Sequence, residues 1–160
     1  MSDWSTVKLD RVRNLMDGLW DGREQGGYLL GREVDGEIEI VDVVALADEE
    51  RRSANQVNLD VTRALEISHR LPAGSGLFLA GSFHCHPPET DSIPSRQDLT
   101  AYESHAEHLD RDWVGVTVCN IPVQVDGIYG RKRDSDRLEI TATLTRFTGR
   151  GFEYSKLKEV

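Results

Sequence analysis

Residues 77–99, LFLAGSFHCHPPETDSIPSRQDL, predict in succession a strand, a short loop and the start of a helix. Residues 77–86 are apolar enough for a buried central strand, and the two prolines that follow cannot continue its backbone pairing. Ser95 and Asp98 stand three residues apart, as in the capping box that opens many helices. A strand that leads through a loop into a helix is typical of an α/β or α+β structure.

Two histidines flank a cysteine at the end of this strand. Successive side chains of a strand point to opposite faces, so His84 and His86 should share one face and Cys85 the other. Asp98 falls in the first turn of the next helix, which a tight loop can bring beside the histidines. Two imidazoles and one carboxylate, with a fourth position left for water, form the ligand set of a catalytic zinc site. The predicted cofactor is therefore one zinc ion per chain.

Each part of this pattern also has a simpler explanation. A single buried histidine is usually a packing residue, and Ser95 with Asp98 can be a capping box alone. Cys85 beside an imidazole also allows a cysteine nucleophile, although strand alternation argues against it. His105 and His108 are predicted to be surface or packing residues, because His105 lies about 10.5 Å along the helix from Asp98.

The remaining elements predict a mixed sheet with helices on its faces. Apolar residues at three- and four-residue steps from Val7 predict a helix that ends near Gly22. The turn signal Asp35-Gly36 joins two strands in a hairpin. Later in the chain, the sequence predicts helices at 59–71 and 95–110 and strands at 113–120, 123–130 and 137–147.

Residues 1–160 are expected to form one domain, with a core over about 5–147 and a tail at 149–160 that is either a last helical turn or a loose end. The basic cluster at 131–133 is interpreted as a solvated hairpin tip.

Bulk properties exclude several classes of protein. The 160 residues carry 19 Lys+Arg against 28 Asp+Glu, and this balance of -9 disfavours nucleic-acid binding. No segment has the apolar run of a signal peptide or a membrane span. Two cysteines, Cys85 and Cys119, are too few for a disulfide framework. We therefore expect a soluble cytoplasmic protein that binds neither nucleic acid nor membranes.

Two separate segments resemble one known family, the JAMM or MPN-plus zinc metalloproteases. The family motif, H-x-H-P followed by S-x-x-D, matches His84, His86, Pro87, Ser95 and Asp98. Many members carry Ser or Thr between the two histidines, so the cysteine here departs from the pattern. The segment EQGGYLLG, residues 24–31, is similar to the family's upstream glutamate segment. The resemblance implies a single MPN-type domain with a mixed, mostly antiparallel sheet flanked by helices, in a cytidine-deaminase-like architecture.

The resemblance also implies a role for each matching residue. His84, His86 and Asp98 would bind zinc, and Ser95 would help to hold the oxyanion. Glu24 would act as general base on the zinc-bound water and then as general acid. A carboxylate beside the metal can accept the water's proton and pass it to the departing amine, which is consistent with these roles.

The implied activity is that of a deubiquitinase-like isopeptidase, which cuts the amide after the C-terminal glycine of ubiquitin or a ubiquitin-like modifier. The implied partners are that C-terminal tail and its conjugated target. An exposed sheet edge could add the tail as a strand, while surface carboxylates meet its arginines. The compact length suggests a bacterial ubiquitin-like conjugation pathway or an antiviral defence system.

Two alternatives stay open within the family: a peptidase that acts on a ubiquitin-like sulfur-carrier protein, and a non-catalytic MPN scaffold. Other zinc chemistries are disfavoured by motifs that the sequence lacks. It contains neither the H-x-E with P-C-x-x-C pair of nucleobase deaminases nor the helical H-E-x-x-H of common metalloproteases.

Overall fold

A computed structural model gives the fold for residues 4–19, 26–45, 61–86, 91–121 and 137–160. Within these ranges no helix has the length and apolar character needed to cross a membrane. The elements in chain order are β1 (Thr6–Lys8), α1 (Asp10–Leu19), β2 (Gly26–Val34), β3 (Glu37–Ala45), α2 (Val61–Arg70), β4 (Phe78–Cys85), α3 (Arg96–Leu109), β5 (Trp113–Ile121), β6 (Arg137–Phe147) and β7 (Phe152–Glu159).

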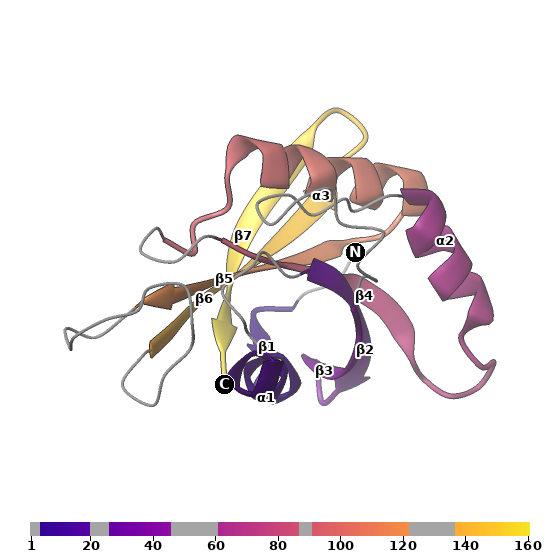
Figure 1. Ribbon diagram of the computed structural model, residues 1–160. Helices are drawn as coiled ribbons and strands as arrows, with labels where there is room; N and C mark the ends of the chain where they lie inside the picture. Colours follow the sequence, from indigo (N-terminus) through magenta and orange to yellow (C-terminus); the bar gives the residue numbers. More distant parts are fainter. Residues whose placement is uncertain (1–3, 20–25, 46–60, 87–90, 122–136) are drawn as a thin grey trace, which may run out of the picture.

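The strands form one mixed sheet that closes into a barrel in the order β1-β3-β2-β4-β5-β6-β7 (Figure 1). Pairing is parallel between β4 and β5 and in the two pairs that involve β1, and it is antiparallel in the other four. The predicted α/β class with a mixed, mostly antiparallel sheet is thus confirmed. The sheet has no open edge at its two ends, because β1 and β7 pair with each other there.

The two strands that close the barrel were absent from the sequence prediction. The helix expected from Val7 begins only at Asp10, because residues Thr6–Lys8 pair with β3 and β7 as β1. The tail, expected as a helical turn or a loose end, contains β7 instead. A three-residue strand is too short to show alternation, and Leu157 is the buried position in a mostly exposed β7, so neither segment carries a clear apolar pattern.

The predicted hairpin is confirmed in register and turn. Val34 pairs with Glu37, which leaves Asp35 and Gly36 as a two-residue loop between β2 and β3. Both loop residues have positive φ, 53° and 77°, as a type I′ turn requires. Asp and Gly accept this backbone conformation more readily than most residues, so the local sequence determines the turn.

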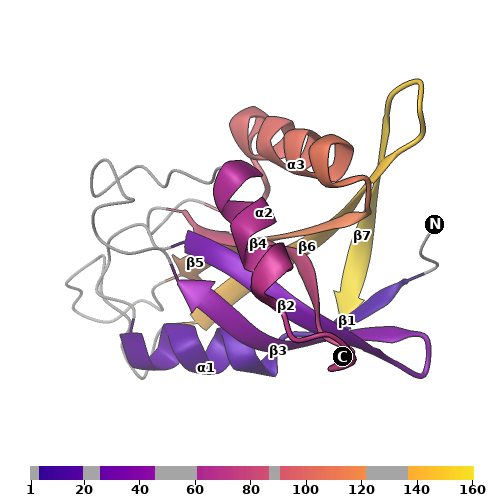
Figure 2. The ribbon, with the colours of Figure 1, turned by 90° about the vertical axis from the view of Figure 1, so that its right-hand side faces the viewer.

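Side chains of the sheet alternate between two apolar clusters. One cluster fills the barrel and includes Val12 of α1, and the other lies between the sheet and α2 and α3. Accordingly, α1 lies on one side of the barrel and α2 and α3 on the other (Figure 1 and Figure 2). In β4, Cys85 belongs to the barrel cluster. Its neighbour His84 therefore faces the side that α3 covers.

The helix α3 lies close against β5 because one position of β5 has no side chain. A Cβ added at Gly115 would lie 2.2 Å from the ring of Tyr102, which is buried. Tyr102 is one helical turn after Asp98, so this contact sets where the first turn of α3 lies relative to the sheet.

The substitution Gly81→Ala should destabilise the fold, because β4 and β5 approach closely at this residue. An added Cβ would lie 1.7 Å from the Val114 carbonyl oxygen, which is backbone and cannot rotate away. We expect a loss of about 3 kcal/mol in the free energy of unfolding, or ~6–12 °C in Tm, measured by thermal unfolding. The control is Gly151→Ala, since a Cβ there meets nothing within 4 Å. Equal Tm values for both variants and the wild type would contradict the parallel pairing of β4 with β5.

Candidate metal centre

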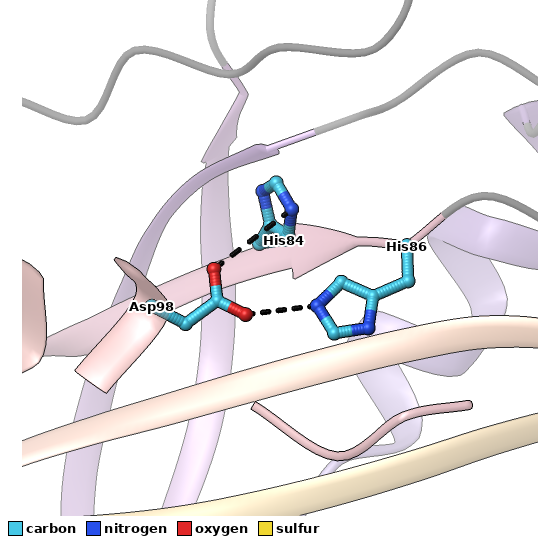
Figure 3. Close-up of side chains that lie close together, drawn as sticks. All are labelled: His84, His86 and Asp98. Atoms are coloured by element: carbon cyan, nitrogen blue, oxygen red, sulfur yellow. Dashed lines mark hydrogen bonds and ion pairs between the residues drawn. The ribbon is translucent and has the colours of Figure 1, made fainter. Parts of the chain in front are cut away.

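The candidate metal centre lies where β4 ends and α3 begins. His84 is the penultimate residue of β4, and His86 directly follows the strand, with its N–H donating to the Val118 carbonyl at 2.8 Å. Asp98 is the third residue of α3. Both imidazoles and the carboxylate turn toward one another (Figure 3). Cys85 points away into the barrel cluster, as strand alternation predicts, which removes the geometry for a cysteine nucleophile beside either ring.

The three predicted metal ligands are close enough to hold one ion. Their ligand atoms all lie within 4.8 Å of one another. Nε2 of His86 lies 2.8 Å from Oδ2 of Asp98, and Nε2 of His84 lies 4.0 Å from Oδ1 of the same carboxylate. All three side chains are largely shielded from solvent, with 12–15% of each exposed. The arrangement therefore fits a partly buried divalent cation bound by two imidazoles and a carboxylate.

The ring of His86 is held from both sides. Its Nδ1 donates to the Asp91 carbonyl oxygen at 2.7 Å, because a carbonyl only accepts. This bond leaves Nε2 directed at Asp98. Histidines that ligate metals usually donate their other ring N–H to a carbonyl or carboxylate in this way. This orientation would allow His86 to bind a metal ion through Nε2, whose proton the ion would displace.

Burial and mutual charge set the protonation of the three groups. Burial lowers the pKa of His84 more than the nearby charge of Asp98 raises it. The hydrogen bond to Asp98 raises the pKa of His86. Burial acts to raise the pKa of Asp98, but the hydrogen bond from His86 and the charge of His84 together bring it below its usual value. An anionic carboxylate and a neutral His84 are the forms that bind a metal.

Ser95 and Asp98 form the predicted capping box. The Ser95 Oγ accepts from the Asp98 N–H at 3.1 Å, and Oδ2 of Asp98 accepts from the Ser95 N–H at 2.8 Å. The cap therefore fixes the carboxylate through Oδ2, while Oδ1 is the oxygen nearer to His84. The capping alternative and the ligand hypothesis are compatible, because the cap orients Asp98 toward the histidines and leaves the Ser95 hydroxyl proton available to donate.

Some predicted features lie outside the described residues. These are Glu24, Pro87, the strand at 123–130 and the basic cluster at 131–133.

The two histidines of α3 have packing and surface positions, as predicted. His105 is buried, stacks on Trp113 with ring centroids 4.5 Å apart, and its Nδ1 donates to the Ala101 carbonyl. His108 is exposed and its Nδ1 donates to the Ser104 carbonyl.

A buried polar network next to the candidate metal centre could not be predicted from the sequence. Ser92 is 1% exposed, and both its N–H and its hydroxyl donate to Oε1 of Glu139 on β6, at 3.0 Å and 2.9 Å. The two residues are 47 positions apart, and nothing local in either segment indicates that they meet. This network ties the loop before α3 to the sheet.

The chain is similar to one family model and to solved structures. The family model described as prokaryotic homologs of the JAB domain matches residues 17–132. The solution structure of protein DSY2949 from Desulfitobacterium hafniense is similar in fold, with a TM-score of 0.57 and 16% identity over 97% of this chain and 92% of that one. The crystal structure of AF2198, a JAB1/MPN domain protein from Archaeoglobus fulgidus, has a TM-score of 0.46 and 14% identity over 97% and 98%. No curated protein matches the sequence.

The substitution His84→Ala should sharply weaken Zn²⁺ binding, because it removes one of three ligand atoms from the cluster. The measurement is Zn²⁺ affinity by chelator competition, with bound metal per chain determined after dialysis. His108→Ala is the matched control, since this histidine is exposed on the last turn of α3 and should leave the affinity unchanged. Full zinc occupancy of both variants would show that His84 is no ligand.

Proposed function

The chain belongs to the prokaryotic homologs of the JAB domain, and from this membership we propose that it is a zinc-dependent peptidase or isopeptidase. The resemblance to the JAMM and MPN-plus family that its motifs indicate is thus confirmed at the level of the family. The observation that carries the proposal is the convergence of His84, His86 and Asp98, whose ligand atoms lie within 4.8 Å of one another.

The residues of the cluster fit a catalytic zinc ion. Two imidazoles and one carboxylate are typical of catalytic sites, which leave a fourth position for water. Zinc held there would lower the pKa of that water and polarise the amide carbonyl of the substrate. The chain's own contribution is to hold the three ligands in place, through the capping box at Asp98 and the Asp91 carbonyl at His86.

We propose Glu24 as the residue that moves the proton. A carboxylate in this role takes the proton of the attacking water and transfers it to the departing amine. The register of the sheet supports the proposal, because Gly26, the first residue of β2, pairs directly with His84. Glu24 stands two residues before Gly26, so the chain enters the sheet beside a proposed zinc ligand.

Ser95 is proposed to stabilise the oxyanion. Ser95 is exposed at the N-terminus of α3. Its Oγ accepts a hydrogen bond from the Asp98 N–H in the capping box, which leaves the hydroxyl proton free to be donated to the substrate. A donor aimed at charge that develops only in the transition state lowers the barrier without tightening ground-state binding.

The substrate we propose is the C-terminal tail of a ubiquitin-like modifier, cut after its last glycine, in a bacterial conjugation or antiviral defence pathway. The negative balance of -9 favours a tail that carries arginines. The closed barrel restricts where such a tail can add as a strand. Among the described strands, β5 beyond Val118 pairs with β6 alone, and this edge begins at the carbonyl that His86 contacts. We propose that the tail pairs there.

The proposed activity is tested with a ubiquitin-like tail that carries a fluorescent amide on its C-terminal glycine. The zinc-loaded protein should release the fluorophore, a chelator should abolish release, and added zinc should restore it. The control is Glu24→Gln, which keeps all three proposed ligands and should retain zinc but lose most turnover.

Each outcome of this assay has a distinct meaning. Chelator-sensitive release by the wild type supports a metallopeptidase. Bound zinc without release from tails of any tested modifier, including sulfur carriers, contradicts it. A protein that binds its partners but no zinc would be the non-catalytic scaffold. Full turnover by Glu24→Gln would remove Glu24 from the mechanism.

The substitution Ser95→Gly separates the two roles of this serine. Glycine is itself a tolerated N-cap, so the free energy of unfolding should fall by only a few tenths of a kcal/mol. Loss of an oxyanion donor should nevertheless lower kcat by about 10²–10³-fold with little change in KM. Urea unfolding and steady-state kinetics on the same variant measure both effects. Unchanged kcat would leave Ser95 as a helix cap only.

A further inference from the structure

We infer that Glu139 is a positioning residue for His86, acting through the single peptide group that joins Asp91 to Ser92. This inference rests on the proposed metal-binding role of His86. Glu139 lies on β6 and accepts hydrogen bonds from both the N–H and the hydroxyl of Ser92, so it acts on the loop before α3 that also contacts His86.

Two hydrogen bonds, one to His86 and one to Glu139, meet at the peptide group between Asp91 and Ser92. We call this connection from Glu139 to His86 the peptide relay. The carbonyl oxygen of Asp91 accepts from Nδ1 of His86 at 2.7 Å. The N–H of Ser92 belongs to the same peptide group and donates to Oε1 of Glu139 at 3.0 Å. Because a trans peptide is planar and its C=O and N–H point in opposite directions, a fixed N–H also fixes the direction of the carbonyl.

Further contacts prevent this peptide from rotating. Ser92 is buried, and since its hydroxyl donates to Glu139, the hydroxyl of Thr141 donates to Ser92 Oγ at 2.7 Å. The hydroxyl of Thr117, which is fully buried on β5, donates to the Ser92 carbonyl. The loop is thus fastened to β5 and β6 on one side of the peptide and to His86 on the other.

The charge of Glu139 should also polarise the peptide group between Asp91 and Ser92. A carboxylate that accepts from one end of a peptide polarises it, and this strengthens the carbonyl at the other end as an acceptor. A stronger acceptor on Nδ1–H makes Nε2 more basic and a better metal ligand, as in the carboxylate–histidine–zinc arrangement of many zinc sites. Here a peptide group would stand between the carboxylate and the histidine.

The test compares Zn²⁺ affinity, by chelator competition, among three variants. Glu139→Ala removes both the acceptor and the charge and should weaken binding by about 10–100-fold. Glu139→Gln keeps an acceptor of the same size without the charge and should fall between this variant and the wild type. Ser92→Ala keeps the peptide relay and loses only the hydroxyl contacts, so it should bind zinc much more tightly than Glu139→Ala.

A second measurement follows the relay directly. The His86 Nδ1–H resonance, observed by ¹⁵N NMR in the zinc-free and the zinc-loaded protein, should move upfield and exchange faster with water in Glu139→Ala, because its hydrogen bond weakens. An affinity within twofold of the wild type with an unchanged resonance overturns the inference. Equal losses of affinity in Glu139→Ala and Ser92→Ala also overturn it, since the network would then only stabilise the loop.

These outcomes are separate from those of the proposed function. If the variants follow the predicted order while no tail amide is cleaved, the hydrolase proposal fails and the positioning role stands. If the wild type binds no zinc, the resonance in the zinc-free protein decides alone: a shift in Glu139→Ala supports the relay, and an unchanged signal refutes it.

Discussion

The contact between the Asp98 carboxylate and the Nε2 of His86 joins the first turn of α3 to the end of β4, and the candidate site depends on it. Three features of the fold support this contact. The backbone of His86 is held by Val118 of β5, the carboxylate is held by the capping box, and Tyr102 places α3 against Gly115. The position of the helix on the sheet therefore determines whether the three ligand atoms converge.

This contact also explains how ionisable groups remain in a largely buried place. Burial of a carboxylate is costly unless charge and hydrogen bonds compensate it. Asp98 receives hydrogen bonds from His86 and from the Ser95 N–H, and its pKa stays below the usual value despite desolvation. A divalent cation between the same groups would compensate the carboxylate more strongly than the imidazoles do. The fold thus holds one largely buried carboxylate where a metal can bind.

Features that depend on a few neighbouring residues could be predicted from the sequence alone. Alternation along β4, the S-x-x-D cap of α3 and the Asp35-Gly36 turn each fix a conformation within a few residues, and each was predicted correctly. Closure of the barrel could not be predicted, because β1 is three residues long and gains its stability from distant partners in β3 and β7. The Ser92 to Glu139 contact was hidden for the same reason, since it exists only once the sheet has formed.

The central claim is that two histidines and one aspartate hold a single zinc ion, and zinc X-ray absorption spectroscopy on the reconstituted protein tests it most directly. The account predicts one zinc per chain with four nitrogen or oxygen neighbours at about 2.0–2.2 Å, two of them imidazoles by their multiple scattering. A sulfur neighbour at about 2.3 Å would place Cys85 or Cys119 on the metal and contradict the account, as would any number of imidazoles other than two.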